Sequence, residues 1–323
     1  MSRERTLRLP TLDDISAARR RIAGLAVRTP LLRLHGDFGG ADVWLKLENL
    51  QPIGSFKLRG AGNAMRRLPA AILTHGVCTA SAGNMAQGVA WCAREMGVPC
   101  RVIVPDHAPR AKLDAVERLG GEVIRVPFAD WWRVIETHDP GDVPGTLVHP
   151  VENDDVIAGN GTIGLEIVED LPDVDAVMVP YGGGGLISGI GAMLRALRPS
   201  CRVLAAEVAT AAPLRASLDA GTPVSITHTP SFVDGIGGRG VLPAMWPLVR
   251  QTVDDSVVVG LDEVAEAIRV LVRHARVVAE GAGAASLAAV LGGRAGGGRV
   301  VCVVSGGNLD SSLLARILSG SLP

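Results

Sequence analysis

The chain has 323 residues and is poor in aromatic side chains and in lysine. Phenylalanine, tryptophan and tyrosine together make up 3% of it, and lysine occurs only at Lys46, Lys57 and Lys112 among 32 basic residues. Arginine cannot lose its proton in a protein and cannot form a Schiff base with an aldehyde. A lysine kept in such a chain is therefore a candidate for chemistry that needs a neutral amine.

Net charge and long apolar runs are also lacking. A formal charge of −1 gives no electrostatic reason to expect binding to nucleic acid or to an anionic membrane. The nearest approach to a membrane span, residues 205–216, contains Glu207, Pro213 and Arg215. Residues 1–5 mix charges and lack the apolar core of a signal peptide. We expect neither a nucleic-acid partner nor a membrane partner.

Cysteine is scarce and has no metal-binding or redox spacing. The five cysteines form no CxxC pair, and Cys78 and Cys302 lie in apolar, strand-like runs. Buried, reduced thiols are typical of a cytoplasmic protein, so we predict a cytoplasmic location.

Short apolar runs alternate with helix-patterned stretches, which predicts an α/β fold with parallel strands and crossover helices. The expected strands are Val43–Leu47, Gly76–Ala80, Arg101–Val104, Glu122–Val126, Ala176–Val179, Arg202–Ala206 and Val300–Val304. The length allows two domains or one two-lobed body. Glycine and proline near residues 141–145 indicate a crossing between lobes.

Lys57 lies in the segment Ser55–Gly60, directly after the turn-like residues 49–54. Small residues on both sides place its amine where backbone can approach a ligand. The alternative is a surface lysine that precedes a helix, and the downstream loops decide between the two.

Four consecutive glycines, Gly182, Gly183, Gly184 and Gly185, separate an apolar strand from an apolar helix pattern. Backbone N–H groups without side chains form an anion nest that suits a phosphate. A flexible linker is the alternative, but linkers rarely join a buried strand to an apolar helix. The loop is neither a Walker A motif nor a dinucleotide fingerprint.

Two further loops, Ser81–Asn84 and Ser305–Asn308, also follow predicted strands. Each alone is explained equally well by a helix cap or a tight turn. Ligands in open α/β sheets bind at the carboxyl ends of the strands, where all these loops are expected. One lysine, one phosphate nest and two polar loops predict pyridoxal 5'-phosphate as the cofactor.

These motifs, in this order, resemble the serine/threonine dehydratase and serine racemase branch of the fold-type II pyridoxal phosphate enzymes. The resemblance implies a tryptophan synthase beta-like fold, with two open parallel-sheet lobes and the cofactor between them. It implies a large cofactor-binding lobe of residues 1–51 and 151–323 and a small mobile lobe of residues 52–150.

The resemblance also implies the roles of individual residues. Lys57 carries the cofactor as a Schiff base and acts as the catalytic base, and Ser81 is the second catalytic residue. Cofactor contacts are implied for Phe56, Lys57, Asn84, Gly182, Gly183, Gly184, Gly185, Leu186, Glu280, Ser305 and Gly306. Substrate contacts are implied for Ser81, Ala82, Gly83, Asn84 and Met85.

The implied reaction is β-elimination: L-threonine, L-serine or a related β-hydroxy amino acid gives a 2-oxo acid and ammonia. Racemases of this branch have a serine where Ala82 stands, so racemisation is disfavoured. Met85 replaces the usual histidine, which leaves the substrate open between threonine, serine and a 3-hydroxyaspartate- or phenylserine-like amino acid. β-Replacement and a non-catalytic sensor are the remaining alternatives.

Several other features stay open at this level. No metal is expected, with Glu207 and the Ala211 carbonyl as a weak candidate site, because Pro213 stands where metal-activated members have a second acid. Trp131-Trp132 either packs in the small lobe or borders the substrate. The resemblance implies a homodimer, and no regulatory domain with feedback control by an end product is expected.

Overall fold

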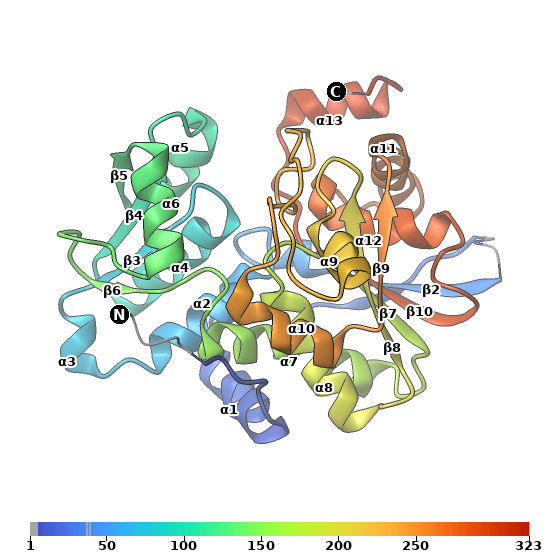
Figure 1. The fold of residues 1–323 in the computed structure, drawn as a ribbon, viewed down its shortest axis with the longest axis horizontal. Coiled ribbons are helices and arrows are strands. Elements are labelled where there is room, and N and C mark those ends of the chain that lie inside the picture. The colour runs from blue at the N-terminus through green and yellow to red at the C-terminus, as the bar shows by residue number, and fades with distance from the viewer. Residues whose placement is uncertain (1–5, 37, 39, 323) are drawn as a thin grey trace.

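The computed structural model describes residues 6–36, 38 and 40–322, and in it the chain forms two separate β-sheets flanked by helices (Figure 1). Residues 1–5, which are expected to lack a signal peptide, lie outside the described part. The larger sheet has the order β1-β2-β10-β7-β8-β9, and every neighbouring pair is parallel except β1 and β2. Its strands are β1 (Leu31–Arg33), β2 (Ala41–Lys46), β7 (Ala176–Pro180), β8 (Arg202–Val208), β9 (Asp255–Val259) and β10 (Gly298–Val303).

The smaller sheet has the order β5-β4-β3-β6, with all strands parallel. Its strands are β3 (Val77–Ala80), β4 (Cys100–Pro105), β5 (Glu122–Val126) and β6 (Thr146–Leu147). The two parallel-sheet regions confirm the predicted fold class. The lobe boundaries at residues 51 and 150 stay a prediction. The crossing expected at residues 141–145 is wrong, because the following β6 still pairs with β3 in the smaller sheet.

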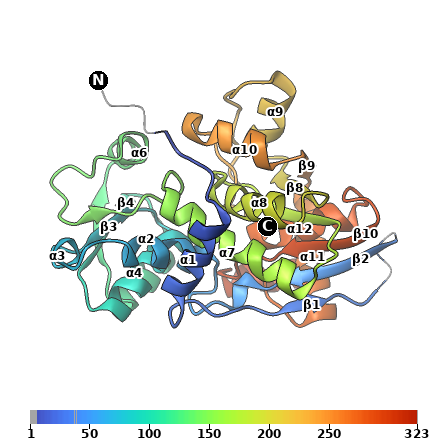
Figure 2. The same cartoon turned by 90° about the horizontal axis from the view of Figure 1, so that it is seen from below.

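Helices cover both sheets. The longer ones are α1 (Leu12–Ile22), α2 (Lys57–Arg66), α4 (Asn84–Met96), α5 (Arg110–Arg118), α6 (Phe128–Thr137), α7 (Asp154–Asp170), α8 (Gly185–Leu197), α9 (Pro213–Ala220), α11 (Leu261–Val270), α12 (Gly281–Leu291) and α13 (Ser311–Leu318). Helix α2 packs on α4 of the smaller sheet and on α7, with α1 beside them (Figure 2). Gly60 and Gly159 permit this approach, because a Cβ on Gly159 would overlap the Arg59 carbonyl.

The predicted strands agree with the observed ones to within two residues at either end. Strands β1, β6 and β9 were not predicted. β1 has three residues, β6 has two, and β9 begins with the polar Asp255 and Ser256, so none of the three shows a long apolar run. Lys57 does not precede a helix; it is the first residue of α2.

A buried network of charges ties α2 to the larger sheet. Arg59 Nε lies 2.8 Å from Glu48 Oε2, and Arg59 Nη1 lies 2.7 Å from Glu166 Oε1. Lys46 Nζ completes the group at 2.6 Å from Glu166 Oε2 and also donates to the Thr29 carbonyl at 2.7 Å. Burial favours the neutral acid, but the charges of Arg59 and Lys46 and the hydrogen bonds from Arg59 and Thr29 together outweigh it and hold the pKa of Glu48 below its usual range. Two cations and two carboxylates balance each other.

The state of the cysteines and the character of the helices can be compared with the expectations from the sequence. All five cysteines are buried and unpaired, as the apolar runs around Cys78 and Cys302 predict. Within residues 6–36, 38 and 40–322, no helix combines the length and the apolar character needed to cross a membrane.

Replacing Arg59 tests the buried network. We expect Arg59→Met to lower the free energy of unfolding by about 3–5 kcal/mol, because it leaves Glu48 and Glu166 buried with one cation between them. The matched control is Arg67→Met, which removes a half-exposed pair with Asp155 at 3.2 Å and should cost about 1 kcal/mol or less. Urea unfolding of both variants measures the difference. Equal losses would contradict a central role for Arg59.

Candidate active site

A cavity of about 410 Å³ lies between the two sheets. It is walled by loops that follow strands of both sheets, as expected for ligand sites in open α/β folds. The predicted site residues that line it are Phe56, Lys57, Ser81, Ala82, Gly83, Asn84, Met85, Gly182, Gly183, Gly184, Gly185, Leu186, Glu280 and Ser305. The structure thus brings together all the predicted cofactor and substrate residues except Gly306.

The Lys57 amine enters this cavity from the first turn of α2. Its one hydrogen bond to a residue that the structure describes is a long contact, 3.5 Å from Nζ to the Pro150 carbonyl. Burial lowers the pKa of Lys57 to about 8, although the nearby Glu280 carboxylate opposes the shift. The amine therefore reaches its neutral, nucleophilic form near physiological pH.

The four glycines end at the start of α8, and no side chain caps this helix. Gly184 has φ +93°, a conformation that favours glycine. A Cβ on Gly183 would lie 2.5 Å from a Val151 methyl carbon, so a side chain does not fit there. The free N–H groups of the first turn of α8 and the helix dipole suit a phosphate.

A second uncapped helix begins at the same cavity. Gly83 precedes α4 without a side-chain cap, and its N–H donates to Ser81 Oγ at 3.2 Å, which closes a tight turn. The N-terminus of α4 therefore offers a second position for an anion, at the loop expected to receive the substrate carboxylate.

A chain of polar side chains lies beside Lys57. Asn308 donates to Asn84 Oδ1 at 2.7 Å, and Asn84 donates to Glu280 Oε1 at 2.7 Å. Burial raises the pKa of Glu280 to about 7, against the effect of the Asn84 hydrogen bond. Gly306 does not line the cavity, but its carbonyl accepts from the Glu280 N–H at 3.1 Å, and a Cβ at this position would overlap the carboxylate.

These features fit pyridoxal phosphate. A buried amine with a lowered pKa suits an aldehyde, and an uncapped helix start without side chains suits a phosphate. Lys57 and Gly182–Gly185 are therefore the residues that could hold the two ends of this cofactor.

The structure gives the positions of two features that the sequence left open. Trp131 lines the cavity, whereas Trp132 does not and donates to Glu136 Oε1 at 2.7 Å on the surface. Glu207 and Ala211 lie outside the cavity. Both Glu207 oxygens accept from backbone N–H groups at the start of α9, at 2.8 and 2.7 Å, so its contacts are those of a helix cap.

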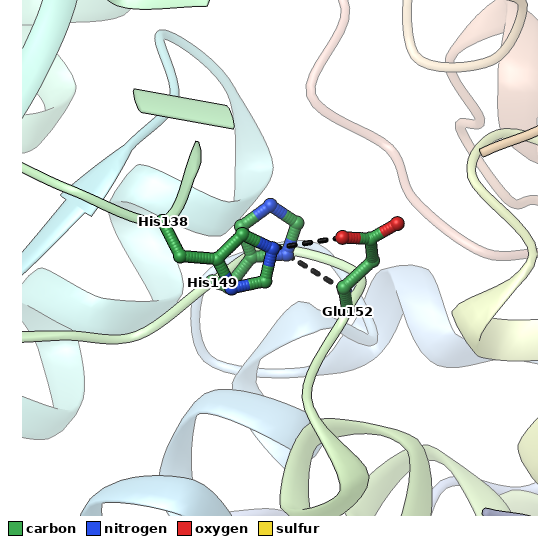
Figure 3. A group of neighbouring side chains, drawn as sticks. All are labelled: His138, His149 and Glu152. Carbon is green, nitrogen blue, oxygen red and sulfur yellow. Dashed lines mark hydrogen bonds and ion pairs between the residues drawn. The ribbon is translucent and has the colours of Figure 1, made fainter. Parts of the chain in front are cut away.

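The sequence did not predict the cluster of His138, His149 and Glu152 (Figure 3). The imidazole rings stack with their centroids 4.1 Å apart, and His138 Nε2 lies 2.8 Å from Glu152 Oε2. His149 Nδ1 accepts from the N–H groups of Val151 and Glu152 at 3.2 and 2.7 Å. That ring nitrogen is therefore engaged by backbone, which favours a structural role over metal binding.

This histidine cluster fixes the backbone on both sides of Pro150. The Pro150 carbonyl accepts from Lys57, and Val151 packs against Gly183. Pro150, Val151 and Asn160 are wall residues to which the sequence assigned no role. Pro150 and Val151 follow β6, which the sequence did not predict, so no strand end indicated them.

Comparisons with known proteins place these residues in context. The family model described as "Pyridoxal-phosphate dependent enzyme" matches residues 22–306. The chain is 40% identical to an L-threonine ammonia-lyase of Thermotoga maritima over 316 residues, 97% of this chain and 79% of that protein. It is 36% identical to a catabolic L-threonine dehydratase of Escherichia coli K12 over 315 residues, 95% of each. The solved structure of maize serine racemase matches with a TM-score of 0.87 and 32% identity, over 97% of this chain and 98% of that one.

The shifted pKa of Lys57 predicts a pH-dependent stability in the cofactor-free protein. Below pH 8 the amine is protonated in both the folded and the unfolded protein, and its burial lowers the free energy of unfolding by up to about 3 kcal/mol. Between pH 8 and 10.5 only the unfolded state keeps the proton, so stability rises with pH. We expect Lys57→Met to be more stable than the parent at pH 7, with the advantage shrinking toward pH 10. Urea unfolding across this range measures it, and a difference independent of pH would contradict the shift.

Proposed function

Because this chain belongs to the family of pyridoxal-phosphate dependent enzymes, we propose that it is an ammonia-lyase of the threonine/serine dehydratase type. It converts a β-hydroxy amino acid into a 2-oxo acid and ammonia. The observation that carries this proposal is the meeting of a buried amine and two uncapped helix starts in one cavity. The relatives named threonine ammonia-lyase and threonine dehydratase support it.

Each of the two helix starts is assigned one anionic group. We assign the phosphate to Gly182–Gly185 at α8 and the substrate carboxylate to Ser81–Asn84 at α4. Both positions are reached by backbone N–H groups, so binding does not depend on a mobile cation. Asn84 and Ser305 are assigned to the polar atoms of the cofactor ring, and Glu280 supports Asn84 through the 2.7 Å hydrogen bond.

Lys57 is the base in this assignment. Bound pyridoxal phosphate supplies an aldehyde for the substrate amine and an electron-withdrawing ring that acidifies the Cα–H. The neutral Lys57 amine takes the Cα proton and the Cβ–O bond breaks; in the net balance the proton taken from Cα leaves with the β-hydroxyl as water. The resulting enamine takes up water and yields the 2-oxo acid and ammonia. A pKa of about 8 keeps part of the Lys57 amine neutral near pH 7.

Elimination is favoured over racemisation by Ala82. A racemase needs an acid on the opposite face from Lys57 to return a proton to Cα, and a methyl group has none to give. Ala82 lines the cavity beside Ser81. The resemblance to the racemases implies that their acid stands at this position. Neither a β-replacement reaction nor a non-catalytic sensor is favoured by a feature of this cavity.

The assembly and location are proposals of the same kind. We propose a homodimer in the cytoplasm, with the lobes divided as residues 1–51 and 151–323, and residues 52–150. Five buried, unpaired cysteines agree with a reducing compartment. The dimer rests on the resemblance alone.

The amine at position 57 can be identified directly. Borohydride reduction of the cofactor-loaded protein should attach the cofactor to Lys57, and not to Lys46 or Lys112, because only Lys57 combines burial at the cavity with a lowered pKa. Peptide mass spectrometry reads the position, and 2-oxo acid release from L-threonine and L-serine reads the activity. Lys57→Ala should lose at least about a thousandfold in kcat. An adduct on another lysine would overturn the assignment.

Product stereochemistry tests the role of Ala82. During turnover of L-serine we expect pyruvate to form at least about a hundredfold faster than D-serine, the scale of a missing general acid. Chiral chromatography of the reaction mixture measures both products. D-Serine formed at a rate comparable to elimination would show that another group supplies the proton.

A further inference from the structure

The smaller sheet supplies an aromatic wall to the cavity, formed by His107, Phe128 and Trp131. The ring centroids of His107 and Phe128 are 5.8 Å apart, and those of Phe128 and Trp131 are 5.6 Å apart. The chain has only four phenylalanines, five tryptophans and one tyrosine, yet Phe56, Phe128 and Trp131 all line this cavity. The aromatic side chains are thus concentrated where a ligand binds.

The strand order places the wall to one side of the carboxylate loop. Ser81 follows β3, His107 follows its neighbour β4, and Phe128 begins α6 after β5, the next strand along. Parallel strands lie about 4.8 Å apart, so the wall stands roughly 5–10 Å from Ser81 along the carboxyl edge of the sheet.

On the other side of β3, the space is taken by residues at the phosphate end of the cavity. There β6 leads to Pro150 and Val151, which lie against Lys57 and Gly183 at the phosphate end of the cavity. A substrate whose carboxylate sits at the start of α4 therefore has its free space toward β4 and β5. Its side chain extends toward the aromatic wall.

The charges at this end of the cavity are paired. Lys112 Nζ lies 2.5 Å from Asp234 Oδ2, and His107 Nδ1 lies 3.2 Å from Asp106 Oδ1. Of the two described lysines that line the cavity, Lys57 and Lys112, only Lys57 has no acidic partner within ion-pair distance. A second carboxylate on the substrate would have to displace Asp234 or Asp106, whereas an apolar group displaces no charge.

Phe128 has a large uncovered surface. The residue is 47% exposed and lies at the edge of the cavity. An aryl group placed here would bury apolar area and could pack against a ring in an offset or edge-to-face arrangement. A methyl group, as in threonine, is too short to cover it.

We propose that the aromatic wall selects β-hydroxy amino acids that carry an aryl group on Cβ, of the phenylserine type, over threonine and serine. This inference rests on the proposed ammonia-lyase function and narrows its substrate class. Phe128 and Trp131 are the specificity-determining residues. Trp132, the next residue, faces away from the cavity.

The test compares kcat/KM for threo-phenylserine, L-threonine and 3-hydroxyaspartate, measured by 2-oxo acid release from the cofactor-loaded protein. We expect phenylserine to exceed threonine by about tenfold or more. Trp131→Leu and Phe128→Leu should each lower kcat/KM for phenylserine about tenfold, with the value for threonine changing less than about threefold. The control, Trp132→Leu, should change neither. Because Phe128 is half-exposed, its variant should fold even if Trp131→Leu does not.

The outcomes separate this inference from the function on which it rests. Turnover of threonine without turnover of phenylserine would overturn the selection by the aromatic wall and leave the lyase function intact. A preference for 3-hydroxyaspartate would also overturn it, since the paired charges would then have opened for a carboxylate. Release of a 2-oxo acid from none of the three would overturn the proposed function itself.

Discussion

The pairing of Arg59 with two buried carboxylates is the interaction on which the site depends. Arg59 follows Lys57 by two residues on α2, so the contacts that fix one side chain also fix the helix that carries the other. Glu48 lies two residues after β2 of the larger sheet, and Glu166 lies on α7. Because a half-paired buried charge is costly, α2 has few alternative positions. The amine is thereby held at the cavity although its own hydrogen bond, to the Pro150 carbonyl, is long.

The same site stores unfavourable free energy. A lysine with a lowered pKa, an acid with a raised one and two helix starts without caps each destabilise the cofactor-free protein. Anions at the helix starts would remove part of this cost. Gly183 and Gly306 shape the same cavity, because the absence of a side chain at each leaves room for Val151 and Glu280 respectively. Binding and folding are therefore coupled at this cavity.

Local patterns in the sequence predicted much of this architecture. The glycine run and the lysine segment were recognisable because each is contiguous and lies at the end of an apolar strand. Pairings between distant residues were not recognisable: Lys112 and Asp234 are 122 positions apart. Of the stacked pair, His138 follows α6 and His149 lies after β6, so the fold sets their approach.

The orientation of the tryptophan pair shows the same limit at short range. Adjacent residues on a helix point in different directions, and only the start of α6 at Phe128 decides which indole faces the cavity. The sequence left packing and substrate contact open; in the structure Trp131 lines the cavity and also packs against buried residues that include Ile103 and Val134.

The small number of lysines has a practical consequence. Lys46 is fully buried and Lys57 opens only into the cavity, whereas Lys112 is part-exposed, with 39% of its side chain accessible. Apart from the terminal α-amino group, a reagent that acylates primary amines would thus find its most accessible target at the cavity mouth. A fluorophore introduced in this way would sit where ligands enter, with few competing labels elsewhere on the surface.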